Sequence, residues 1–238
     1  ILLGQHGSIE TEYGEVSIVD LMLEEESAKR VEATDEGVVY SLDRLGVPLV
    51  EIGTGPDIRS PAGARAAAER IGMLLRSTGS VKRGLGTIRQ DVNVSIAEGA
   101  RVEVKGVQDL RGIEDIVRGE VGRQAELLEI RDALRGRDAT VGDPQPVTDV
   151  FADTDSGVVR RAIDAGGSVF AVPLRGFDGL VGREIQSDRR LGTELSDHAK
   201  RHGAGGVFHT DELPAYGVTD AEVAALREAV GAGEDDAV

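Results

Sequence analysis

Two neighbouring segments, residues 87–96 and 101–107, alternate apolar and polar side chains along most of their length. A period of two is the pattern of a strand that has one buried and one exposed face. If a three-residue loop joins the two segments, they form an antiparallel hairpin. One face of this hairpin is then a dense polar row, which is either an ordinary solvated surface, the common case, or a site. The row consists of Asn93 opposite Glu103 and Asp91 opposite Lys105.

The rest of the chain predicts a mixture of strands and helices. Ser60 followed by Pro61 is a helix N-terminus signal, and residues 135–146, rich in Gly, Pro and Asp, predict a domain boundary. We therefore expect an α+β fold, with an antiparallel-sheet domain over residues 1–136 and a small α+β domain over residues 148–238. Strands are expected at residues 16–23, 38–42, 47–52, 168–174 and 206–209, and helices at residues 60–79, 108–134 (one or two helices), 155–165, 193–202 and 219–230.

The charge of the chain limits its partners. The net charge is −16, and arginine supplies 23 of the 27 basic residues, a bias typical of proteins from salt-adapted organisms. Because an acidic surface repels phosphate groups, any contact with nucleic acid must be local. Cysteine is absent, and no stretch approaches the roughly 20 apolar residues of a membrane span. We expect a soluble cytoplasmic protein and, because the chain opens at Ile1 without methionine, a piece of a longer one.

Carboxylates are the strongest chemical signal. Three acids in a row, from Glu24, follow the apolar run at residues 16–23, and Glu51 stands in the middle of another apolar run. A carboxylate buried there requires a partner or a cation. Mg²⁺ that also holds nucleotide phosphates takes such oxygen ligands, and an ion pair between Glu51 and Arg44 or Arg59 is the alternative.

Other familiar chemistry is missing from the sequence. No P-loop or dinucleotide fingerprint occurs, and the glycine cluster at residues 83–87 leads into a strand, so we interpret it as a loop. His198 and His202 have a metal-ligand spacing but lack the glutamate of metalloproteases, and we expect them to be a surface pair.

Several longer strings resemble known proteins. Those of the first half resemble the family shared by the B and E subunits of tRNA-dependent amidotransferases, with Glu26 where that family has aspartate. Those of the second half resemble the insertion domain that archaeal E subunits share with bacterial aspartyl-tRNA synthetases and that B subunits lack. The chain therefore resembles an internal fragment of an E-type member. The strings are residues 23–29, 41–52, 56–61, 84–96 and 103–107, followed by residues 151–154, 182–186, 192–195 and 208–216.

The resemblance implies a reaction and its partners. It implies a ligase in which ATP phosphorylates the γ-carboxylate of glutamate on Glu-tRNA(Gln), and ammonia then yields Gln-tRNA(Gln). An asparaginase-like D subunit would supply the ammonia within a heterotetramer. The fold implied is a cradle-like catalytic domain followed by the insertion domain.

The resemblance also implies site residues. Glu25 and Glu51 would be catalytic and, with Glu24, would bind Mg²⁺. The family's metal-binding histidine precedes Ile1 in this comparison, so we expect an incomplete metal site and an inactive fragment. The nucleotide or substrate would contact Asp91, Asn93, Glu103 and Lys105.

A second hypothesis remains open. The chain would be a non-catalytic module that docks tRNA or a partner protein of the complex, and its acids would serve only solubility. Arginines such as Arg183, Arg189 and Arg190 would then bind tRNA.

Overall fold

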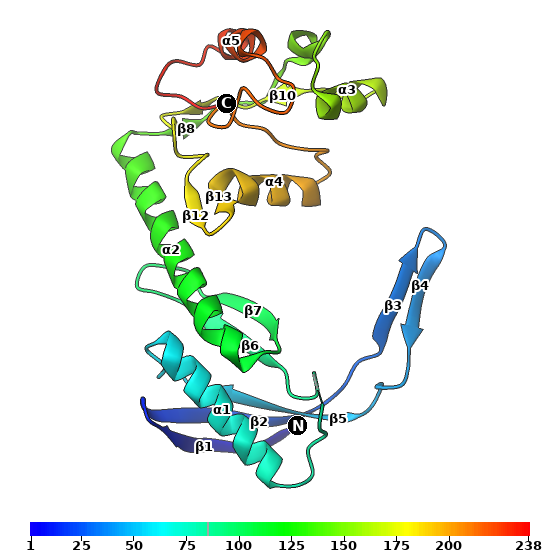
Figure 1. Cartoon of the computed structure of the whole chain (residues 1–238), viewed down its shortest axis with the longest axis vertical. Helices are drawn as coiled ribbons and strands as arrows, with labels where there is room; N and C mark the ends of the chain where they lie inside the picture. Colours follow the sequence, from blue (N-terminus) through cyan, green and yellow to red (C-terminus); the bar gives the residue numbers. More distant parts are fainter. Residues whose placement is uncertain (85) are drawn as a thin grey trace. The chain divides into compact units, whose positions relative to one another are not determined.

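The computed structural model describes residues 1–84 and 86–238 and confirms an α+β fold with antiparallel strands (Figure 1). Leu85, in the glycine cluster at residues 83–87, lies outside the described residues. Contacts divide the chain into two compact units, which are described separately. The first unit is Ile1–Asn93 with Glu103–Arg118, and the second is Val94–Val102 with Gly119–Val238. The predicted domains, residues 1–136 and 148–238, divide the chain elsewhere and stay a prediction.

A three-stranded antiparallel sheet forms the base of the first unit. Its strands are β1 (Leu2–Thr11), β2 (Gly14–Glu25) and β5 (Pro48–Thr54), in the order β1-β2-β5. The central strand β2 therefore has two neighbours, whereas β5 is an edge strand of this sheet. β1 was not predicted from the sequence.

Helix α1 (Pro61–Ser77) packs against this sheet, as the predicted helix at residues 60–79 implied. The Ser60 hydroxyl oxygen accepts a hydrogen bond from the Gly63 backbone N–H at 3.0 Å, which satisfies one of the free donors of the first turn. Ala67 is the helix residue at the centre of the contact. The small core comprises Ile9, Val16 and Ala67, with Ile18, Ile58 and Ile71 packed against it.

Two hairpins complete the strands of the first unit. Strands β3 (Lys29–Thr34) and β4 (Gly37–Ser41) pair only with each other among the described residues, and β3 was not predicted. Strands β6 (Gln90–Val94) and β7 (Val102–Val107) are shorter than predicted but alternate as expected. In the β6–β7 hairpin, the polar row is exposed while Val92 and Val104 are half-buried, so the predicted faces are confirmed.

Helix α2 (Ile113–Gly136) follows a short 3-10 turn (Leu110–Gly112) and is one continuous helix. In its second-unit part, the buried Gln124 amide donates to the Val94 carbonyl at 3.1 Å. The same side chain accepts from the Ile96 N–H at 3.3 Å. Gln124 thereby holds the loop end of the β6–β7 hairpin.

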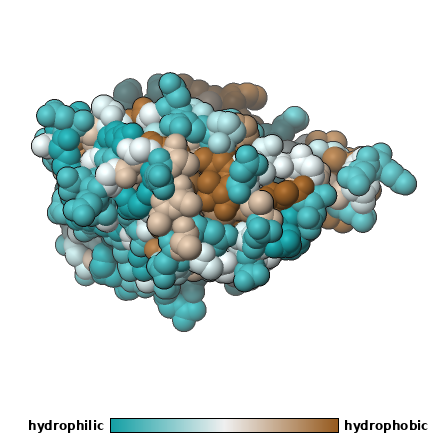
Figure 2. All heavy atoms as spheres, turned by 90° about the horizontal axis from the view of Figure 1, so that it is seen from above, coloured by the Kyte–Doolittle hydropathy of each residue, from teal (hydrophilic) through white to brown (hydrophobic). Residues whose placement is uncertain are grey.

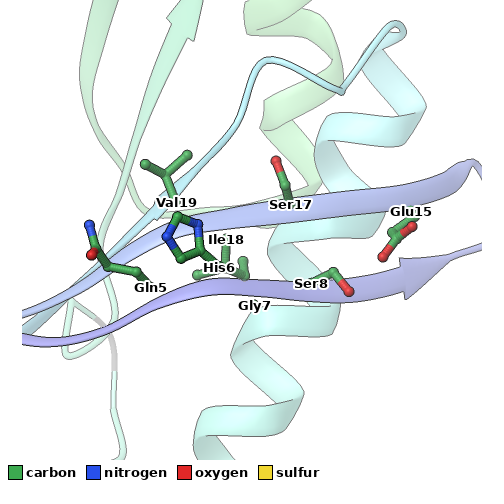
Figure 3. A pocket seen from close by; sticks show the side chains of 8 residues that line it. All are labelled: Gln5, His6, Gly7, Ser8, Glu15, Ser17, Ile18 and Val19. Carbon is green, nitrogen blue, oxygen red and sulfur yellow. The ribbon is translucent and has the colours of Figure 1, made fainter.

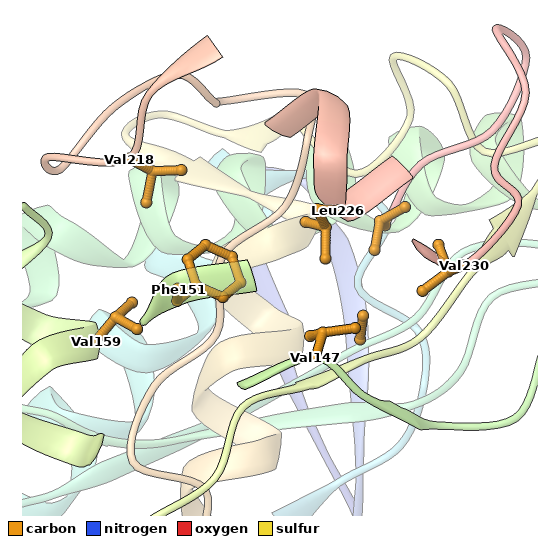
Figure 4. Close-up of a cluster of buried hydrophobic side chains, with 8 residues drawn as sticks. Val147, Phe151, Val159, Val218, Leu226 and Val230 are labelled. Atoms are coloured by element: carbon orange, nitrogen blue, oxygen red, sulfur yellow. The ribbon is translucent and has the colours of Figure 1, made fainter. Parts of the chain in front are cut away.

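The second unit has short strands and three further helices, and side chains from two of these helices enter one apolar core (Figure 4). Its strands pair as β8–β11, β9–β10 and β12–β13, all antiparallel. The core comprises Val147, Phe151, Val159, Ala171, Val218, Leu226, Val230 and Val238. The elements are β8 (Thr140–Val141), β9 (Gln145–Pro146), β10 (Phe170–Ala171), β11 (Leu174–Arg175), β12 (Glu184–Gln186), β13 (Arg189–Arg190), a 3-10 turn (Thr148–Phe151), α3 (Gly157–Asp164), α4 (Leu191–Arg201) and α5 (Asp220–Ala229).

Two predicted elements of the second unit are wrong. The predicted strand at residues 168–174 is two separate strands, β10 and β11, which pair with different partners. The described residues 206–209 form no strand, because Phe208 packs on the core without a partner strand and His209 is buried beside it. The three helices α3, α4 and α5 confirm their predictions within a few residues. His198 and His202 are an exposed pair on and beside α4, with ring centroids 4.8 Å apart.

The exposed surface agrees with the high net charge. On the face shown in Figure 2, hydrophilic residues dominate and surround a smaller hydrophobic patch. Within the described part of the chain, every helix is too short or too polar to span a bilayer.

Candidate functional site

The acidic end of β2 lies beside β5. Glu24 pairs with Leu49, and Met22 pairs with Glu51, in a register that is regular from Asp20 to Glu25. Directly paired residues share a face of a sheet, and successive residues alternate. Glu24 and Glu51 therefore share one face as diagonal neighbours, whereas Glu25 faces the other side.

The prediction that Glu51 is buried is wrong. Its side chain is exposed, because β5 is the edge strand of its sheet and leaves one side uncovered. Among the described residues, Glu51 forms no ion pair with Arg44 or Arg59. The buried Nε atom of Arg44 has no hydrogen-bond partner among the residues that the structure describes. The carboxylate of Glu51 is thus available to a ligand instead of being neutralised by an arginine.

The polar row of the β6–β7 hairpin is held by local contacts. Asp91 accepts a hydrogen bond from the Gly106 N–H at 2.8 Å. The Lys105 ammonium lies 3.0 Å from a Glu103 carboxylate oxygen. The hydrogen bond and charge of Glu103 raise the pKa of Lys105, and the charges of Asp91 and Glu51 add to this increase. The field of Glu51 therefore reaches the polar row, while Asn93 is an exposed member of it.

An ion pair that was not predicted joins the end of the acidic run at β2 to the start of the β6–β7 hairpin. Arg89, directly before β6, donates from Nη2 to the Glu26 carboxylate at 2.6 Å. The two residues are 63 positions apart, so no local pattern in the sequence could reveal the pair. The available signal was indirect: Arg89 belongs to the alternating polar face, and Glu26 is the last residue of the acidic run that begins at Glu24.

The β1–β2 hairpin carries an open hollow of about 500 Å³ (Figure 3). His6, at φ 59°, and Ser17 contribute to its lining. The Asp57 carboxylate accepts hydrogen bonds from the hydroxyl of this Ser17 and, at 2.9 Å, from the Ser17 N–H. These bonds hold the pKa of Asp57 below its usual range and tie the segment after β5 to β2. The hollow was not predicted from the sequence.

The arrangement of the carboxylates shows whether these side chains could bind the predicted Mg²⁺. Within the described residues, no group of three or more His, Asp or Glu side chains is arranged to hold a metal ion. Mg²⁺ bound together with nucleotide phosphates uses only one or two carboxylates and completes its shell with phosphate and water oxygens. Glu24 and Glu51, on one face, fit this shared arrangement but not a cage made by the protein alone. The role of Glu25 stays a prediction.

Comparisons with known proteins place the chain in a family. Residues 2–201 match a family model described as the GatB/GatE catalytic domain. The E subunit of the glutamyl-tRNA(Gln) amidotransferase of Halobacterium salinarum is 75% identical over 237 residues, which cover 100% of this chain and 38% of that protein. The corresponding protein of Haloarcula marismortui is 71% identical over 238 residues (100% and 38%), and that of Methanosarcina barkeri is 58% identical over 237 residues (99% and 37%).

The matches cover all or nearly all of this chain but only part of each relative. The chain spans about 38% of the length of the two haloarchaeal relatives named above, although they match it from end to end. The matches confirm the resemblance to E-type proteins that the sequence motifs indicated. Since the family model covers most of its residues, the chain belongs to the GatB/GatE catalytic-domain family.

Proposed function

We propose that this chain is the part of a glutamyl-tRNA(Gln) amidotransferase that activates tRNA-bound glutamate with ATP for amidation. The observation that carries the proposal is the 75% identity, over the whole chain, to a relative named as the E subunit of that amidotransferase. The acidic end of β2 and β5, together with the exposed polar row of β6 and β7, supports the same assignment because phosphoryl transfer requires both cation ligands and phosphate contacts.

The chemistry begins with a carboxylate that ammonia does not attack readily. A γ-carboxylate oxygen attacks the terminal phosphorus of ATP, the bond from that phosphorus to the ADP oxygen breaks, and ADP leaves. Ammonia then forms a bond to the γ-carbon, phosphate leaves with the activating oxygen, and a proton is lost from nitrogen. Mg²⁺, when bound, offsets the negative charge of the phosphates and the carboxylate.

The chain's own side chains have separate tasks in this proposal. Glu24 and Glu51 would hold Mg²⁺ together. Glu25, on the opposite face of β2, would act beside this site without joining that ligand pair. Lys105 binds phosphate oxygens through its ammonium group, and the ion pair with Glu103 holds that group on the polar row. The Asn93 amide donates to the substrate, and Asp91 fixes the β7 backbone through Gly106.

The proposed partners follow from the reaction. Ammonia comes from a separate asparaginase-like D subunit, the substrate is Glu-tRNA(Gln), and the complex is a cytoplasmic heterotetramer. These assignments are proposals that rest on the similarity to E subunits.

The docking hypothesis is less well supported, because two of the arginines it requires are already engaged. Arg183 binds Glu126 at 2.6 Å and also contacts Glu129. Arg189 binds Glu194 and Asp197, each at 2.9 Å. These acids raise the pKa of both guanidinium groups. A tRNA phosphate would have to displace them.

Calorimetry tests the proposed function directly. Mg²⁺ and ATP binding is measured in high KCl, which screens the charge of the acidic surface, for the full-length protein that contains this chain and for its Glu51→Gln variant. We expect the affinity for Mg·ATP to fall about tenfold or more in the variant, because one metal ligand loses its charge. Glu32→Gln, which removes an exposed acid from the β3–β4 hairpin, is the matched control. Equal binding by the native protein and Glu51→Gln would contradict the proposal.

A further inference from the structure

Glu26 is fixed on several sides although it lies just beyond the end of β2. Its backbone N–H donates to the Val47 carbonyl at 2.9 Å, and its own carbonyl accepts from the Gly46 N–H at 3.1 Å. Its side chain is only 14% exposed. A carboxylate that has lost most of its water requires a compensating partner. Arg89 is that partner, at 2.6 Å.

The other partner of the ion pair, Arg89, lies at the start of the polar row. It directly precedes β6, and the period of two puts it on the same face as Asp91 and Asn93. Its guanidinium group is the one cation that forms an ion pair with the run Glu24–Glu25–Glu26 among the described residues. The pair therefore connects the start of the polar row to the end of the acidic run.

We infer that the Arg89–Glu26 ion pair is a positioning pair that holds the polar row of β6 and β7 against the acidic end of β2. The inference rests on the proposed function, because that function requires the phosphate-binding row and the metal-binding carboxylates to act on one nucleotide. Neither Arg89 nor Glu26 contacts the substrate in this role. The effect of Glu51 on Lys105 is the independent sign that the two regions are close.

Steady-state kinetics of Gln-tRNA formation, with the chain in its full-length protein and complex, tests the inference. We expect Glu26→Gln and Arg89→Gln each to raise the KM for ATP about tenfold, the loss typical of one charge-assisted hydrogen bond. The charge-swapped double variant, Glu26→Arg with Arg89→Glu, is expected to recover most of this loss. Glu26→Asp, which keeps the charge on a shorter side chain, is expected to be intermediate.

A second measurement does not depend on activity. In hydrogen exchange of the same proteins, Arg89→Gln is expected to accelerate exchange of the β6 and β7 amides while α1 exchanges as before. Arg118→Gln is the matched control, because it removes an exposed ion pair with Asp115 on α2. It is expected to leave both the KM and the exchange rates within about twofold of the native values.

The outcomes separate the two proposals. A native complex that forms no Gln-tRNA from Glu-tRNA(Gln) and ATP contradicts the proposed function, whereas accelerated exchange of the hairpin in Arg89→Gln would still support the positioning role. An active complex with native KM values and native exchange in both single variants overturns the positioning role alone. The positioning role is also overturned if both single variants raise the KM for ATP and the charge-swapped variant does not lower it again. A positioning pair depends on the attraction between the two charges and not on which position carries which charge.

Discussion

In the first unit, the apolar cluster at the contact of α1 with β1 and β2 has only three buried members, whereas the cluster around Phe151 in the second unit has eight, including side chains from α3 and α5. The first unit instead leaves long strand faces exposed, including the polar row and the acidic end of β2. Burial stabilises a fold in proportion to the apolar area removed from water. The comparison therefore indicates that the second unit is the more strongly packed body, and that the first has given up core area for exposed polar surface.

The largest expected effect comes from the core of the second unit. Phe151→Ala removes a side chain that is 5% exposed, and we expect a loss of about 3–5 kcal/mol in the free energy of unfolding. Urea unfolding followed by circular dichroism in KCl measures it. Phe170→Ala, at a position that is 62% exposed, is the matched control and is expected to cost about 0.5 kcal/mol or less. Equal losses in the two variants would show that Phe151 does not anchor a compact core.

An intermediate effect is expected from Asp236, the buried acid near Val238. Hydrogen bonds from the Gly233 N–H and from Arg175 lower its pKa from 3.8 to about 2. Because the pKa is lower in the folded state, this acid stabilises the fold above pH 3.8, and the stabilisation is lost as the pH falls towards 2. Asp236→Asn is expected to cost about 1–2 kcal/mol at neutral pH after allowance for solvent screening.

The pH dependence supplies the test of Asp236. The difference in unfolding free energy between the native protein and Asp236→Asn should shrink steadily between about pH 4 and pH 2. Asp235→Asn, which changes an exposed neighbour, is the control and should show no such trend. A difference that stays constant with pH would mean that Asp236 acts through its shape and not through its charge.

The smallest expected effects compare one helix start in each unit. The α1 cap is a single bond from the Gly63 N–H to the Ser60 hydroxyl. At the start of α5, the Thr219 hydroxyl accepts from the Glu222 N–H, and the Thr219 backbone N–H donates to the Glu222 carboxylate. Ser60→Ala is expected to cost about 1 kcal/mol and Thr219→Ala somewhat more, up to about 2 kcal/mol, in the same unfolding assay. If Ser60→Ala lowers the free energy of unfolding by more than Thr219→Ala does, the stability of the helix starts does not follow the difference in packing between the two units.

Local chemistry made several elements predictable. The strict alternation of β6 and β7 fixed their faces, because only one assignment buries the valines together. Ser60 and Pro61 marked the start of α1 through cap chemistry that depends on neighbouring residues only. The acidic run at the end of β2 was located in the same way, from residues adjacent in sequence.

Features that depend on topology were not predictable. Glu51 stands in an apolar run that suits a central strand, but the order β1-β2-β5 makes its strand an edge. Glycines interrupt the alternation in β1, and that strand forms because β2 provides its hydrogen-bond partner. The Arg89–Glu26 pair joins residues that are far apart in the sequence. Pairing partners across such distances follow from the assembled fold and not from local periodicity.

Lys105 is one of only four lysines, and all four are exposed. Amine-reactive reagents acylate the neutral form of a lysine, so each labelled position can be resolved by mass spectrometry without crowding from neighbouring amines. Since Glu103 and its acidic neighbours raise the pKa of Lys105, this amine should react more slowly than the amine of a free lysine side chain. Because lysine is scarce, the labelling rate of Lys105 can be followed by itself and would report a ligand that binds to the polar row.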